Sequence, residues 1–179
     1  MQQVKAQHIL GSSGYKINNS LIFNGDTWLS QTNPVSSSDG QRWTLSFWFK
    51  PGIMSANGLQ QILGSVLSPG GADNDLRLNW YVSLYGKPLG KITFECGASA
   101  ATEFSLEGAY RDFSSWYHCV ISWDNTRSDW GKLKFYINGK LLSGTNNGSL
   151  PNMNPCPYTQ EGVTRYVGGT RAIEGGEYG

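Results

Sequence analysis

Carboxylate side chains are the first candidates for chemistry in this sequence, because two of them held across a glycosidic bond can hydrolyse it. Glu95 is the only carboxylate inside a segment with a clear strand pattern, KITFEC at 91–96. Glu103 and Glu107 follow in a polar stretch with alanine and glycine, which we predict to be a loop. We therefore expect both to be solvated surface charges, and we expect no pair of catalytic acids.

Other catalytic arrangements find little support in the sequence. The chain has two histidines, His8 in the N-terminal segment and His118 within the apolar run WYHCVISW at 116–123. It contains no G-x-S-x-G elbow, no phosphate-binding glycine loop and no helix pattern with paired histidines. We predict that the protein is not an enzyme.

Aromatic side chains are the remaining candidates, since Phe, Tyr and Trp make up 13% of the residues. Tyr81 and Tyr85 lie on the polar face of their predicted strand, and Trp130 and Tyr158 lie in predicted loops. Exposed aromatic rings stack on sugar rings or on protein partners, so these four are the candidate ligand-binding residues. Covering a neighbouring strand is an equally good explanation for each of them alone.

These side chains must be positioned by β-strands, because apolar residues alternate with polar ones in several segments. Alternation is strict in LRLNWYVSLY at 76–85, and KITFEC repeats it after a GKPLG turn. WTLSFWFK at 43–50 shows the same pattern and ends at Pro51. The apolar residues of 59–67 have helical spacing, but nearby glycines leave too little room for a stable helix, so we predict a strand at 61–66.

The segment from 116 to 142 predicts a pair of antiparallel strands. WYHCVISW is apolar on both faces, as in a central strand that is covered on both sides. LKFYI at 133–137 has one clean apolar face, and Asn138-Gly139 then makes a tight reversal. The loop DNTRSDWG between the two strands is rich in turn-forming residues and is predicted to face solvent.

Together these segments predict an all-β protein built as a sandwich or a barrel. A length of 179 residues suits one domain. We assign residues 20–179 to this domain and residues 1–19 to an N-terminal arm, whose His8-Ile9-Leu10 is too small an apolar group to fold alone. The predicted core consists of Leu45, Phe47, Leu78, Trp80, Phe94, Cys119, Ile121, Phe135 and Ile137.

Charge and hydropathy exclude several classes of partner. Lys and Arg (14) nearly balance Asp and Glu (13), so we expect no binding to nucleic acid or to an anionic membrane. No apolar run approaches the ~20 residues of a membrane-spanning helix, and we expect no signal peptide at the N-terminus. Cys96, Cys119 and Cys156 are odd in number and far apart, which favours reduced thiols in a cytosol-made protein over a disulfide.

Five motifs follow one another along the chain: LIFNGDTWLS at 21–30, WTLSFWFKPG at 43–52, SSWYHCVISWD at 114–124, LKFYINGKLL at 133–142 and RYVGG at 165–169. Their order resembles the laminin G-like, concanavalin A-like jelly-roll superfamily, which implies a two-sheet antiparallel jelly-roll sandwich. More narrowly, YKINNSLIFNGDTWLSQTN and the later YRDFSSWYH are similar to laminin G-like proteins encoded by tailed bacteriophages.

The resemblance has implications for the candidate sites. Related endo-glucanases carry their acids as E-x-D-x-x-E on one strand face, and this pattern is absent here. Family members often have a histidine where His118 stands, which implies packing and hydrogen bonding. Laminin G-like and pentraxin-like relatives often bind calcium at rim loops, so Asp73, Asp75 and Asp124 are weak calcium candidates. Capping of their own backbone is the usual role of such loop residues, and we expect no cofactor.

The end of the sequence departs from the family pattern. After RYVGG, family members usually continue into a last long strand with an acidic residue, whereas this sequence ends with EGGEYG. We expect the sandwich to lack its last strand, which a longer native chain or a partner would supply.

Three functions are compatible with the resemblance. We expect a non-catalytic structural or adhesion module of a tailed-phage virion, as a fibre or spike part or a capsid decoration that is made in the host cytoplasm. Its partners would be other virion proteins, copies of itself and, as a further candidate, a host-surface glycan, with the arm 1–19 docking on a neighbouring subunit. The alternatives are a free carbohydrate-binding lectin and, with less support, a glycan hydrolase.

Overall fold

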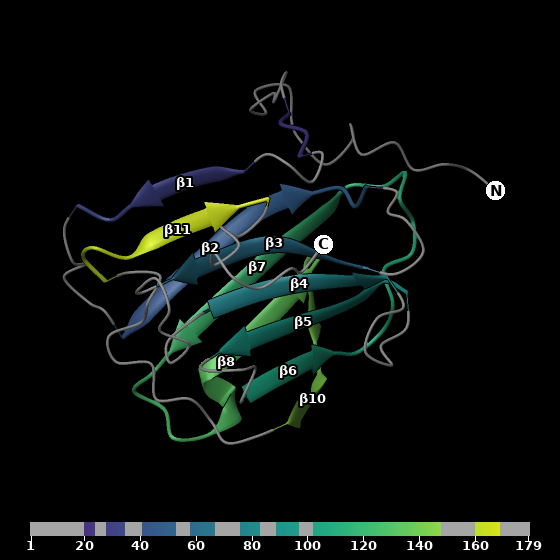
Figure 1. Cartoon of the computed structure of the whole chain (residues 1–179). Helices are drawn as coiled ribbons and strands as arrows, with labels where there is room; N and C mark the ends of the chain where they lie inside the picture. Colours follow the sequence, from purple (N-terminus) through teal and green to yellow (C-terminus); the bar gives the residue numbers. More distant parts are fainter. Residues whose placement is uncertain are drawn as a thin grey trace, which may run out of the picture.

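Two β-sheets stacked face to face form the part of the chain that the computed structural model describes (Figure 1). Figure 1 shows the larger sheet in front and the smaller sheet behind it. The described residues are 20–23, 28–34, 41–52, 58–66, 76–82, 89–96, 102–147 and 160–168. The predicted arm (1–19) and the segment 169–179, which bears on the expected missing strand, lie outside them.

Hydrogen-bonded neighbours in both sheets run antiparallel, as in the predicted two-sheet sandwich. In order across the sheet, the seven-stranded sheet contains β1 (Leu29–Thr32), β11 (Thr164–Val167), β3 (Gly58–Val66), β4 (Leu76–Val82), β5 (Lys91–Cys96), β6 (Thr102–Leu106) and β10 (Gly144–Asn147). The four-stranded sheet contains β2 (Arg42–Phe49), β7 (Tyr117–Asp124), β8 (Leu133–Ile137) and β9 (Lys140–Leu142). A 3-10 turn, η3 (Trp130–Lys132), precedes β8.

Aromatic rings from the inner faces of the two sheets meet in the core. The ring centroid of Phe135 on β8 lies 5.7 Å from that of Phe94 on β5 and 6.3 Å from that of Phe104 on β6. Trp123 on β7 contacts Phe94 and stacks on Trp43 of β2. Because each ring covers a large apolar area, these contacts hold the sheets together across the sandwich.

Most of the predicted core is confirmed. Leu45 and Phe47 are only half-buried against the core, because their strand β2 pairs on one side alone within the described part of the chain. Trp80 lies in β4, and its side chain lies outside the described part. The predicted core residues that are buried are Leu78, Phe94, Cys119, Ile121, Phe135 and Ile137.

The segment with helical spacing forms strand β3, as predicted. The ladder between β3 and β4 shifts register between Gln61 and Leu63, which is a β-bulge. The bulge changes which face the residues point to, so that the consecutive residues Ile62 and Leu63 both contact the core. This irregularity explains why the apolar spacing in β3 does not have the two-residue period of a regular strand.

Strand β7 is central in its sheet, between β2 and β8, but it is covered fully on one face only. Its inner side chains are buried, whereas those of the outer face are half-buried. The predicted cover on both faces is therefore wrong, and the outer face of the four-stranded sheet meets solvent. The predicted reversal at Asn138-Gly139 is confirmed, since both residues have left-handed φ values of 52° and 79° and join β8 to β9.

Cys119 is a free thiol in the core. Burial raises the pKa of this thiol to about 12, so it stays protonated at neutral pH. The Cys96 side chain and Cys156 lie outside the described part of the chain. In that part, no helix has the length and apolar character needed to cross a membrane.

The first and last described segments lie against each other at one edge of the seven-stranded sheet. Strand β1 pairs with β11, and the ring of Phe23 lies over Gly168. A Cβ atom at residue 168 would lie 2.2 Å from the Phe23 ring, and the φ of Gly168 is +81°. Glycine is therefore required at 168 for both its conformation and the close approach.

Replacing Phe135 with alanine tests this account of the core. Because the ring is buried between two rings of the opposite sheet, Phe135→Ala should lower the free energy of unfolding by roughly 3–5 kcal/mol. Denaturant unfolding measures this loss. Lys134→Ala is the matched control, because Lys134 is exposed on the other face of β8 and its loss should cost less than about 0.5 kcal/mol. Equal effects of the two substitutions would contradict the core assignment.

Candidate functional site

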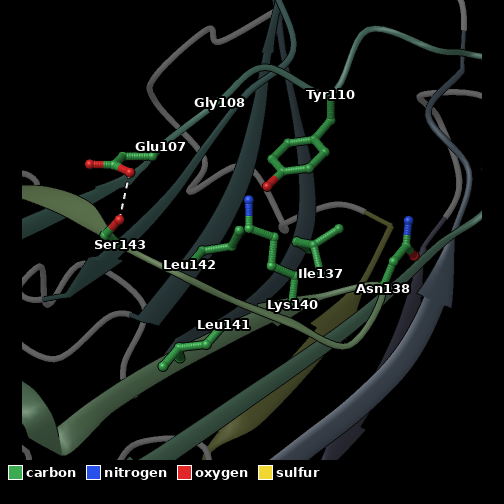
Figure 2. A pocket seen from close by; sticks show the side chains of 9 residues that line it. All are labelled: Glu107, Gly108, Tyr110, Ile137, Asn138, Lys140, Leu141, Leu142 and Ser143. Atoms are coloured by element: carbon green, nitrogen blue, oxygen red, sulfur yellow. Dashed lines mark hydrogen bonds between the residues drawn. The ribbon is translucent and has the colours of Figure 1, made fainter.

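A hollow opens where the edges of the two sheets come together. The chain passes from β9 at the edge of the four-stranded sheet, through Ser143, to β10 at the edge of the seven-stranded sheet. The hollow at this crossing has a volume of about 510 Å³ (Figure 2). Its lining residues are Glu107, Gly108, Tyr110, Ile137, Asn138, Lys140, Leu141, Leu142 and Ser143.

Two hydrogen bonds between Glu107, which directly follows β6, and Ser143 of the crossing segment close one side of the hollow. The backbone N–H of Glu107 donates to the carbonyl oxygen of Ser143 at 2.8 Å. The Ser143 hydroxyl donates to Glu107 Oε2 at 2.5 Å, which Figure 2 draws as a dashed line. The carboxylate of Glu107 is thus already engaged, although the residue is exposed as predicted.

Lys140 points into the hollow because of its place in the β8–β9 ladder. It pairs with Ile137, whose side chain faces the core, so Lys140 takes the inner face of β9. Figure 2 shows its side chain reaching toward the hydroxyl of Tyr110. No residue of the described part forms a hydrogen bond or ion pair with the Lys140 ammonium.

Tyr110 presents its hydroxyl to the hollow from the opposite side (Figure 2). Its backbone N–H donates to the carbonyl of Gly90 at 2.8 Å, and its ring meets Tyr117 edge to face at 5.5 Å. Burial, with smaller contributions from nearby Cys119 and Tyr117, raises the pKa of Tyr110 to about 12. The phenol therefore remains a neutral hydroxyl that can donate a hydrogen bond at physiological pH.

Gly90 makes this position of Tyr110 possible. Its φ is +80°, and a Cβ atom there would lie 2.7 Å from the backbone of Tyr110. The contact holds the segment after β6 against the turn before β5. The hollow has a hydroxyl from Tyr110, an ammonium from Lys140 that no described residue pairs with, and an apolar wall from Ile137 and Leu142. This arrangement is suited to binding.

The structure corrects what the sequence predicted for Glu95 and Glu103, which lie on the outer face of the seven-stranded sheet. Glu103 lies in strand β6, so the predicted loop is wrong, and it stands directly opposite Glu95 of β5. Phe104 and Leu106 point into the core and give β6 its alternation, which the polar composition of the segment obscured. An acid pair therefore exists across two strands, although none is encoded within one strand.

Each of these acids accepts a hydrogen bond from a hydroxyl of its own strand. Thr93 Oγ1 donates to Glu95 Oε1 at 2.9 Å, and the Ser105 hydroxyl donates to a carboxylate oxygen of Glu103. Glu95 is only 5% exposed even though its position is on the face opposite the core. A polysaccharide chain would reach Glu95 only with difficulty.

The side chains of the four aromatic residues predicted to bind a ligand lie outside the described part of the chain. Tyr81 lies in β4 opposite Lys91 of β5, and Trp130 begins η3, but neither side chain belongs to the described part. Tyr85 and Tyr158 lie outside the described residues altogether.

An exposed aromatic residue that we had not selected is Trp48. It is 55% exposed on the outer face of β2 and stacks on His118 with ring centroids 4.8 Å apart. His118 Nε2 is also 2.9 Å from the Ser46 hydroxyl, so His118 makes the packing and hydrogen-bonding contacts that the resemblance implied. The alternation of WTLSFWFK already places Trp48 on the outer face and was the available signal.

Of the three calcium candidates, Asp124 alone belongs to the described residues. Asp124 accepts hydrogen bonds from the Thr126 hydroxyl at 2.6 Å and the Thr126 N–H at 3.0 Å, and these lower the pKa of the Asp124 carboxyl. This is a local turn cap. Asp73 and Asp75 lie outside the described residues, and within those residues no group of three or more metal-binding side chains occurs.

Asp112 in the motif YRDFSSWYH has a similar structural role. Its carboxylate accepts hydrogen bonds from the backbone and hydroxyl of Ser114 and from the hydroxyl of Ser115. These bonds lower the pKa of Asp112 to about 2. The motif thus fixes the turn that leads into β7.

Comparison with known proteins identifies the fold. Residues 23–171 match the family described as the concanavalin A-like lectin/glucanases superfamily, in its laminin G branch. No curated protein sequence matches this chain. The native heptameric SAP-like pentraxin of Limulus polyphemus is 18% identical with a TM-score of 0.52, over 83% of this chain and 61% of the pentraxin chain.

A second similar structure is the CBM40 module of the Ruminococcus gnavus IT-sialidase bound to α2,6-sialyllactose. It is 16% identical with a TM-score of 0.51, over 74% of this chain and 67% of that chain. Both structures share the fold, and the chain spans less than two thirds of the length of the pentraxin. The family match covers most of the sequence and the two sheets have the expected architecture, so this chain belongs to the concanavalin A-like lectin/glucanase superfamily and has its jelly-roll fold.

Proposed function

We propose that this protein is a non-catalytic adhesion module that binds a glycan in the hollow at the crossing of the two sheets. The observation that carries the proposal is the convergence of the Lys140 ammonium, which pairs with no described residue, and the Tyr110 hydroxyl over an apolar wall. The fold is shared with a carbohydrate-binding module whose structure contains sialyllactose, which supports a glycan as the ligand class.

The lining of the hollow suits the chemistry of a sugar. A sugar ring carries hydroxyl groups that accept and donate hydrogen bonds, and C–H faces that pack on apolar side chains. Lys140 and Tyr110 supply donors, Glu107 supplies an acceptor, and Ile137 and Leu142 supply apolar contact. The volume of about 510 Å³ lies in the usual range of ligand sites.

Removing the Tyr110 hydroxyl tests the glycan site. Tyr110→Phe keeps the ring in its contact with Tyr117 but deletes a donor in the hollow, so the dissociation constant should rise about five- to tenfold. Binding is measured by screening the protein on a glycan array and titrating the strongest glycan by calorimetry. Tyr136→Phe, on the outer side of β8, is the control and should leave the affinity unchanged. Absence of binding to any glycan would refute the proposed function.

A glycan hydrolase is the second candidate, and the opposed pair Glu95 and Glu103 favours it. Opposed residues on neighbouring strands have Cβ atoms about 4.5–5.5 Å apart, and the carboxyl groups of retaining glycosidases are about 5–5.5 Å apart. Against catalysis stand the burial of Glu95 and the hydroxyl that hydrogen-bonds each acid. We favour binding, because a catalytic acid must reach the scissile bond and Glu95 is buried.

A reducing-end assay distinguishes binding from hydrolysis. The protein should release no sugar from the glycans that it binds, and Glu95→Gln should behave like the unchanged protein. Glu103→Gln, on the facing strand, serves as a second variant. Cleavage that disappears in Glu95→Gln and Glu103→Gln would establish the hydrolase instead.

The proposal further places the module on the particle of a tailed phage, as a fibre or spike part or a capsid decoration. The similarity of YKINNSLIFNGDTWLSQTN and YRDFSSWYH to phage-encoded laminin G-like proteins supports this location. In this arrangement, residues 1–19 are an arm that docks on a neighbouring virion subunit. The arm carries His8-Ile9-Leu10, a small apolar group that a partner would cover.

Deleting residues 1–14 tests the virion location. The deletion removes no described strand, since β1 begins at Leu29, so the thermal unfolding midpoint should remain unchanged. Incorporation into purified particles, measured by quantitative mass spectrometry, should be lost. If the truncated protein is incorporated normally, the arm has no docking role, and if the intact protein never occurs on particles, the virion location is wrong.

A further inference from the structure

The two charged residues of the hollow differ in the partners that they have. Lys140 is the basic residue of the lining and Glu107 the acidic one within the described part of the chain. The Glu107 carboxylate accepts the Ser143 hydroxyl, and the neighbouring Lys91 ammonium donates to the carbonyl of Leu106, one residue before Glu107. The Glu107 carboxylate and the Lys91 ammonium thus each have a hydrogen-bond partner, whereas the Lys140 ammonium has none among the described residues.

Lys140 also brings hydrogen-bond donors to the hollow. The ammonium of Lys140 has three N–H donors and no partner among the described residues. The hydroxyl of Tyr110, which stays protonated at neutral pH, faces the same space from the other side. A ligand that fills this space best brings acceptors, and an anionic group is the strongest acceptor for the ammonium.

Accordingly, and resting on the proposed glycan function, we infer that the hollow selects sugars that carry an anionic group. The anion pairs with the Lys140 ammonium and accepts from the Tyr110 hydroxyl, while the sugar ring packs on Ile137 and Leu142. A carboxylate and a phosphate offer the same chemistry to an ammonium, which binds either one as a point charge. Neutral sugars lack the ion pair and bind more weakly.

A structural role for Lys140 makes a different prediction. Within the described part of the chain, β9 is an edge strand, and an inward-pointing charge on an edge prevents pairing with another chain. Either sign of charge serves that purpose. Lys140→Glu would then leave sugar binding unchanged, whereas the anion site requires a positive charge.

The experiment compares pairs of glycans that differ only in charge. Each uronic-acid oligosaccharide is titrated beside its carboxyl-reduced neutral counterpart, and each sugar phosphate beside its dephosphorylated form. The anionic member should bind about five- to tenfold more tightly, and the difference should shrink as salt is raised. The anionic series that binds more tightly shows whether the charged group of the ligand is a carboxylate or a phosphate.

Substitutions assign the preference to the hollow. Lys140→Gln should abolish the preference and Lys140→Glu should reverse it, while Lys134→Gln, an exposed lysine on the outer face of β8, should leave it intact. An unchanged thermal midpoint confirms that the variants fold. Equal affinity for charged and neutral members overturns this inference but leaves the glycan function standing, whereas binding of neither member refutes both. A preference that survives in Lys140→Glu places the anion elsewhere and also overturns the inference.

Discussion

The contact of Phe135 with Phe94 and Phe104 sets the geometry on which the rest of the structure depends. These rings fill the space between the sheets and so fix how far apart the two layers stand. The strands that carry them also lead to the hollow. Strand β8 continues through a two-residue turn to Lys140, and Glu107 directly follows the end of β6, the strand that carries Phe104. The width of the hollow is therefore a consequence of core packing.

Strand positions could be predicted well because their signal is local. Alternation of apolar and polar residues is visible in any short window, and it located β2, β4, β5, β7 and β8 and most of the core. The bulge in β3 could not be predicted, since it is defined by pairing with β4. The short strand β6 was taken for a loop because only Phe104 and Leu106 mark its inner face, and their polar neighbours dominate the composition.

The candidate site was harder to predict than the fold. Its lining comes from two segments that are distant in the sequence: 107–110 follows β6 of the seven-stranded sheet, and 137–143 includes β9 of the four-stranded sheet. Nothing in either segment shows that these edges meet. Lys140 in particular looks like an ordinary surface lysine beside a turn, and its inward position follows only from its register with Ile137.

The order of strands also separates the ends of the domain from its hollow. Strand β1 and the contact of Phe23 with Gly168 lie at one edge of the seven-stranded sheet, whereas β10 and the hollow lie at the opposite edge (Figure 1). The chain thus enters and leaves the described domain at the same side. A partner that contacts the sheet edge at β1 therefore lies across the full width of the seven-stranded sheet from the hollow. This arrangement lets one small sandwich be held at one edge while the opposite edge stays accessible.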